Sequence, residues 1–204
     1  MGSYADDALF MSRNNIEYVE LISDDGKSKV MVIPAWQGRV MTTSAAGDEG
    51  DSYGWINYSF IKKRQIDLQF NPVGGEERFW LGPEGGVFSL YFRQGEKQIY
   101  KNWKVPPVLD IEAFKIQSQS KNCICLTKEG CLTNACGTTF YLNIKRTISL
   151  LDINEFAASF NLEFPKDIKA VAYKSDNQIT NIGNESWNKE TGLISVWMLS
   201  LIHI

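Results

Sequence analysis

Hydrophobic and polar residues alternate with a period of two along most of this chain. The clearest run is residues 140–150, whose apolar positions are Phe140, Leu142, Ile144, Ile148 and Leu150. Such alternation is typical of β-strands with one buried face and one wet face. Similar patterns predict further strands over residues 17–22, 29–33, 38–43, 87–92, 114–119, 122–127, 156–164 and 192–198. The turn signals between these segments indicate an antiparallel β-sandwich.

Only the N-terminus follows a different period. In residues 6–14 the apolar positions fall at helical spacing, with Asp6 and Asp7 as candidate caps. The sequence therefore predicts an all-β antiparallel sandwich with a short N-terminal helix, built as one domain over residues 1–198.

One strand position breaks the alternation. Arg146 stands in phase between Ile144 and Ile148, on a face that is otherwise apolar. A bulge or a sheet edge would let this long side chain reach solvent. The alternative is a charged group that lines a cleft over a concave sheet.

Residues 71–86 differ from the rest of the chain in composition. They hold five of its sixteen glycines, together with three glutamates, one arginine and one tryptophan. Carboxylates and guanidinium groups can bond to sugar hydroxyls, and an indole can stack on a sugar's C–H face. We therefore expect a carbohydrate site at one mouth of the sandwich, formed by Arg39, Glu76, Glu77, Arg78, Trp80 and Glu84. The alternative is a compact loop with Arg78 paired to a glutamate and Trp80 in the core.

Three functions fit this composition. The first is non-catalytic carbohydrate binding, and the second is a sugar epimerase, lyase or hydrolase that uses the glutamates as acid and base. Adjacent Glu76 and Glu77 point in opposite directions on an extended segment, so either of them would pair with Glu84. The third function is purely structural.

Charge and motif spacing narrow the choice of partners. The chain has 21 basic and 24 acidic residues, a net charge of −3, so no basic field would attract nucleic acid. No apolar run approaches the roughly 20 residues of a transmembrane helix. The glycines fit neither the phosphate-loop nor the dinucleotide-binding spacing, and the sequence predicts no cofactor. It leaves the oligomeric state open.

The four cysteines do not predict a metal site. Cys123, Cys125, Cys131 and Cys136 follow the spacing C-x-C-x5-C-x4-C, which lacks the paired knuckles of structural zinc sites. We expect reduced, half-buried thiols. A disulfide across the turn at residues 128–130 is the alternative in an oxidising compartment.

We interpret the chain as an incomplete domain with a foreign tail. The apolar run of residues 192–198 continues into residues 199–204 without a polar turn, and this last segment is interpreted as non-native. It contains His203, the only histidine, so histidine-dependent nucleophilic and metal sites are not predicted. The N-terminus carries no signal peptide. We expect a cytoplasmic protein, or a periplasmic or cell-envelope protein if an upstream signal peptide has been lost.

The tryptophan–glycine motif of residues 74–86 resembles a bacterial family, common in Bacteroidetes, that is known as a domain of unknown function. Residues 37–42, 54–57, 132–134 and 192–198 are also similar to it. That family in turn resembles the galactose-mutarotase-like superfamily of sugar-binding β-sandwiches. The resemblance implies this fold and a sugar-sized cleft. It implies no catalytic residue, because the histidine acid and glutamate base of mutarotases have no matching position here.

Overall fold

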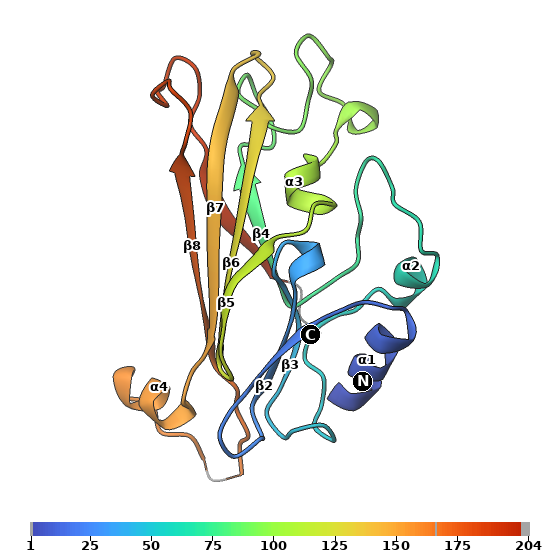
Figure 1. Cartoon of the computed structure of the whole chain (residues 1–204), viewed down its shortest axis with the longest axis vertical. Helices are drawn as coiled ribbons and strands as arrows, with labels where there is room; N and C mark the ends of the chain where they lie inside the picture. The colour runs from blue at the N-terminus through green and yellow to red at the C-terminus, as the bar shows by residue number, and fades with distance from the viewer. Residues whose placement is uncertain (1, 166, 201–204) are drawn as a thin grey trace.

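The computed structural model describes residues 2–165 and 167–200. Within them lie nine strands in two antiparallel sheets, which confirms the predicted all-β sandwich (Figure 1). The larger sheet has the order β1-β2-β3-β4-β9, with β1 (Val19–Ile22), β2 (Lys29–Ile33), β3 (Arg39–Ser44), β4 (Glu77–Gly82) and β9 (Ser195–Ser200). The smaller sheet has the order β5-β6-β7-β8, with β5 (Lys115–Gln119), β6 (Cys123–Thr133), β7 (Thr139–Leu150) and β8 (Tyr173–Asn181).

Short helices connect and cover the strands. They are α1 (Tyr4–Arg13), α2 (Tyr58–Lys62), α3 (Pro107–Asp110) and α4 (Ile153–Ser159), with 3-10 turns η1 (Pro34–Trp36) and η2 (Tyr100–Asn102). The predicted N-terminal helix is confirmed, but its cap is Ser3. The Ser3 hydroxyl accepts a hydrogen bond from the backbone N–H of Asp6, and the Asp6 carboxylate accepts one from the backbone N–H of Ser3. This reciprocal capping box satisfies two otherwise unpaired donors of the first turn.

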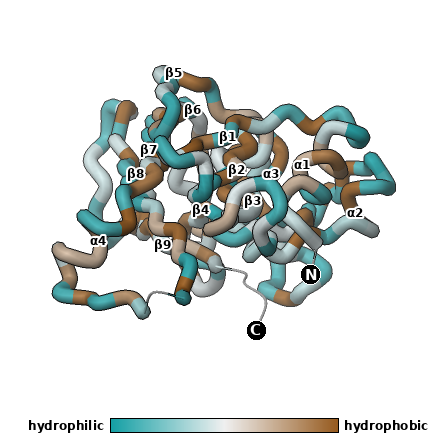
Figure 2. The backbone as a smooth tube through the Cα atoms, turned by 90° about the horizontal axis from the view of Figure 1, so that it is seen from below, coloured by the Kyte–Doolittle hydropathy of each residue, from teal (hydrophilic) through white to brown (hydrophobic). Residues whose placement is uncertain are grey.

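The larger sheet is covered on both faces. One face packs on the smaller sheet through an apolar core that includes Val40, Phe79 and Ile144. The other face packs under α1 and α2 through a second cluster that includes Met31 and Met41. Figure 2 shows the five strands between the four-stranded sheet and these two helices. Strands buried on both faces need apolar residues at successive positions, which is why β2 and β4 do not alternate.

Two predicted strands are wrong. Within residues 156–164 the chain begins in helix α4, which is capped by the Asp152 carboxylate through the backbone N–H groups of Asn154 and Glu155. The alternation there does not reflect a buried face, because Phe160 is 64% exposed. Residues 87–92 form a loop without a β-ladder.

Strands β4 and β8 occur where the pattern predicts none. β4 lies inside the glycine-rich segment, and β9 pairs with it along its whole length, with Trp80 opposite Trp197. The other side of β9 is an edge of the larger sheet. Of the segment interpreted as a tail, Leu199 and Ser200 belong to β9. Residues 201–204, with His203, lie outside the described residues.

Arg146 lies between the sheets, fully buried. It is on the inner strand β7, where its Nε donates to the carbonyl of Gly38 at 3.0 Å and its Nη1 to the Asn177 side chain at 2.7 Å. Its Nη2 forms an ion pair with Glu77 of β4. The predictions of a solvent-reaching side chain and of a cleft-lining one are therefore both wrong, because the charge is satisfied in the interior.

Three further features bear on function. In the described part of the chain, no helix has both the length and the apolar composition needed to cross a membrane. All four cysteines carry free thiols, of which Cys125 is buried and Cys131 exposed. No group of three or more metal-ligating side chains occurs among the residues that the structure describes.

Candidate functional site

Strand alternation separates the six side chains that the sequence groups as a carbohydrate site. Glu77 points toward the smaller sheet, where it meets Arg146, whereas Arg78 points to the opposite face and meets α3. Val40 pairs with Glu77, which places Arg39 of β3 beside Arg78 on that opposite face. The candidate site is therefore the face of β3 and β4 that carries the two arginines.

Arg78 is held by helix α3 and by two aromatic rings. Its Nη2 donates to the carbonyl of Leu109 at 2.9 Å and to the Asp110 carboxylate at 2.8 Å. Its guanidinium group lies 4.3 Å from the ring centre of Trp80 and 5.1 Å from that of Phe70. Because the side chain is 3% exposed, the ion pair and the aromatic contacts fix its position without competition from water.

Arg39 has no carboxylate partner. Its Nη1 donates to the carbonyl of Gly74 at 2.7 Å, and its Nε, like the Nε of Arg78, is buried without a partner. Burial lowers the pKa of Arg39 well below its usual value, and the neighbouring Arg78 lowers it further. Two buried guanidinium groups therefore lie side by side, and Asp110 pairs with Arg78 alone.

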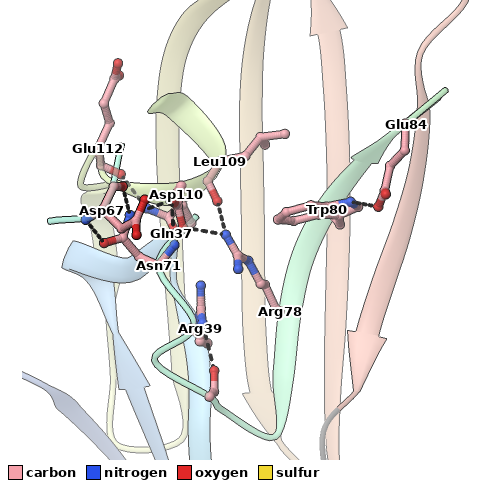
Figure 3. Close-up of polar contacts among 11 residues, drawn as sticks. Gln37, Arg39, Asp67, Asn71, Arg78, Trp80, Glu84, Leu109, Asp110 and Glu112 are labelled. Carbon is pink, nitrogen blue, oxygen red and sulfur yellow. Dashed lines mark hydrogen bonds and ion pairs between the residues drawn. The ribbon is translucent and has the colours of Figure 1, made fainter. Parts of the chain in front are cut away.

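Asp110 and Asn71 form a fixed polar pair at the edge of this cluster (Figure 3). The backbone N–H and the side-chain amide of Asn71 donate to one Asp110 oxygen at 3.0 and 2.7 Å. Asn71 is in turn bonded through its side chain to both backbone groups of Asp67. With Arg78 on its other oxygen, Asp110 is held by three donors from two segments.

Trp80 is a core residue in this structure. It is 2% exposed, with the Tyr91 ring stacked at 5.3 Å and the Arg78 guanidinium at 4.3 Å. Its Nε1 donates to the Glu84 carboxylate at 2.6 Å. Tyr91 continues the stack onto Trp103, with ring centres 5.6 Å apart. No face of the Trp80 indole is open to a ligand in this arrangement.

The glutamates do not form an acid–base pair. β4 runs from Glu77 to Gly82, and at about 3.3 Å per residue its two ends are roughly 17 Å apart. Glu84 lies beyond one end of the strand, whereas Glu76 and Glu77 lie at the other. Carboxylate pairs of glycosidases stand only about 5–10 Å apart. Each of these glutamates also has a partner of its own, Thr43 for Glu76, Arg146 for Glu77 and Trp80 for Glu84.

The buried carboxyl of Glu76 should make the stability of the folded protein depend on pH. Burial raises the pKa of its carboxyl, against hydrogen bonds from Thr43 and Tyr173 that lower it. The folded state then holds the proton more tightly than the unfolded state, so stability falls as pH rises from about 4.3 through the raised pKa. We expect Glu76→Gln, which can still accept the Thr43 hydroxyl, to be more stable than the wild type near about pH 7 but not near about pH 4. Urea unfolding at both pH values measures this, with Glu96→Gln at an exposed loop position as the control. A pH-independent difference would contradict it.

A pocket of about 330 Å³ adjoins the arginine cluster. Asp110 and Asn71 form part of its wall, with the aromatic side chains Trp36 and Phe60 and the polar side chains Arg64 and Gln65 also lining it. These residues show no common signal in the sequence. They come from four separate segments without a shared motif. Asn71 is the first residue of the glycine-rich segment, and the Arg78–Asp110 ion pair links the pocket wall to the same segment.

The fold and this cluster define a class of protein, a β-sandwich with a buried arginine pair behind a polar pocket. The chain belongs to a family of unknown function, DUF6786, whose model matches residues 2–203. Comparisons with curated proteins and with solved structures gave no match. The family match agrees with the predicted domain of unknown function. It does not test a Bacteroidetes origin or the resemblance to the galactose-mutarotase-like superfamily, and both stay predictions.

Proposed function

We propose that the protein binds carbohydrate without catalysis and that the sugar occupies the pocket beside Asp110. One observation carries the proposal, namely that an aromatic surface and an oriented carboxylate–amide pair line the same concavity. Trp36 is half-buried and can offer an indole to the C–H face of a sugar. Asp110 and Asn71 are fixed in place before any ligand arrives, which lowers the entropic cost of binding.

The hydrogen-bonding capacity of this wall suits hydroxyl groups. An ionised carboxylate has about four acceptor sites, and protein donors occupy three at Asp110. The exposed side chains of Arg64 and Gln65 supply donors on the pocket wall. A volume of about 330 Å³ falls at the small end of ligand pockets, so we expect a monosaccharide or one residue of a longer glycan.

The tryptophan–glycine motif acts indirectly in this proposal. Arg78 orients Asp110, and Trp80 and Phe70 hold Arg78 between them. The motif would then build the pocket wall without touching the sugar. A catalytic role has less support, because the candidate acid and base stand at opposite ends of β4.

Replacing Trp36 with alanine should weaken sugar binding by at least about tenfold, a loss of about 1.4 kcal/mol. The stacking surface would be lost while Asp110 and Asn71 stay in place. Isothermal titration calorimetry against a monosaccharide panel measures the effect, and a thermal melt checks that the variant is folded. Trp187→Ala is the matched control, because Trp187 is also half-buried but lines a separate pocket at the far end of β7 and β8. Absence of binding to any sugar, or a loss with Trp187→Ala instead, would refute the proposed site.

A further inference from the structure

The pocket beside Asp110 is lined by one cationic side chain and has further cations close to it in sequence, in a chain whose net charge is −3. Arg64 lines it directly, and Lys62 and Lys63 are exposed just before Arg64 at the end of α2. Arg39 bonds to Gly74, next to the wall residue Val73. Among the described residues that line the pocket, Asp110 alone carries a carboxylate.

The buried part of this charge is unbalanced. Asp110 pairs with Arg78, no described carboxylate forms an ion pair with Arg39, and Glu77 pairs with Arg146 on the other side of β4. The Nε atoms of both Arg39 and Arg78 are buried with no partner. An uncompensated buried cation is unfavourable, and an anion nearby relieves that cost. Counted over Arg39, Arg78 and Asp110, one net positive charge lies behind the pocket wall, and it favours an anionic ligand over a cationic one.

We infer that the ligand of this pocket is an acidic sugar of the uronic acid class, with its carboxylate toward Arg64 and its hydroxyls toward Asp110. The inference rests on the proposed function and names the class of sugar. A guanidinium group can bind a carboxylate through two parallel hydrogen bonds, and Arg64 uses one Nη2 bond, to the carbonyl of Arg13 at 3.3 Å. Asp110 accepts hydroxyls but repels a second carboxylate, so the pocket orients the sugar.

The test compares matched acidic and neutral sugars by isothermal titration calorimetry on the full chain. The probes are glucuronate with glucose, galacturonate with galactose, and glucose 6-phosphate and acetate as other anions. We expect one uronate to bind about tenfold more tightly than its neutral partner at low salt. Screening should reduce that preference as salt is added, since the Debye length falls to about 3 Å at 1 M.

Arg64→Gln should weaken uronate binding about tenfold and neutral-sugar binding much less, so that the preference for the uronate is lost. Arg64 is exposed, so the variant is expected to fold. Arg93→Gln, which removes an exposed arginine from a different pocket, is the matched control and should leave both affinities as they are. Equal binding of acidic and neutral sugars would overturn the inference and leave the proposed function standing. Tighter binding of the phosphate, or acetate binding as well as the uronate, would also overturn it. Binding of no sugar would refute the proposed function itself.

Discussion

Replacement of Arg146 by methionine is expected to lower the free energy of unfolding by about 3–5 kcal/mol. The side chain is fully buried and satisfies the carbonyl of Gly38, the Asn177 amide and the Glu77 carboxylate. Without the guanidinium group, Glu77 keeps a negative charge between two sheets with no counter-ion. Urea unfolding at neutral pH measures the loss.

The double variant Arg146→Met with Glu77→Gln separates the ion pair from the packing. It removes the stranded charge, so it should be more stable than Arg146→Met alone. A single variant that loses less than about 1 kcal/mol would show that Glu77 escapes to water, and the interior ion pair would then contribute little.

Trp80→Ala is expected to cost about 3–5 kcal/mol, because it opens a cavity in the core. The indole packs against Arg78 and Tyr91 and donates to Glu84, and each of these partners would lose a contact. Trp197→Ala is the matched control. Trp197 pairs with Trp80 across β4 and β9 but is 44% exposed, so its loss should be near about 0.5 kcal/mol.

Sugar binding by the same Trp80 variant distinguishes two sites. If the sequence-predicted site is correct, Trp80→Ala abolishes binding at little cost in stability. If the pocket beside Asp110 binds the sugar, the folded variant keeps measurable binding, weakened only through the lost support of Arg78, despite its lower melting temperature. Calorimetry below the melting transition decides between these outcomes.

Periodicity predicts the strands whose two faces differ in solvent exposure. Residues 140–150 alternate because one side of β7 meets the larger sheet while Tyr141 and Lys145 are exposed. β4 has no such signal, because its Phe79, Trp80 and Leu81 are all buried. A short apolar run among glycines is typical of loops as well as of doubly covered strands. The strand therefore depends on partners that local sequence does not contain.

Residues 156–164 show the opposite case, in which the alternation predicts a strand but the segment begins in helix α4. The apolar residues of α4 satisfy a period of two by coincidence, whereas the N-cap Asp152 is the signal that favours a helix.

The candidate site could be predicted from the sequence only in part. Arg39 and Arg78 are adjacent because β3 pairs with β4, but Asp110 reaches Arg78 from a different segment. No spacing rule connects residues that meet only through a tertiary contact.

The strand order also has a consequence for the sequence of events in folding. β5, β6, β7 and β8 pair with their neighbours along the chain, so the smaller sheet requires shorter loop closures than the pairing of β4 with β9. β9 pairs with β4 after all four of those strands have intervened, and such distant pairing is slow because loop-closure entropy is lost first. The edge of β4 that β9 covers therefore stays unpaired at least until residues 195–200 have been made. Until β9 pairs, the backbone N–H and C=O groups along that edge of β4 are free to bond to another chain, so the interval before β9 docks is the one most exposed to aggregation.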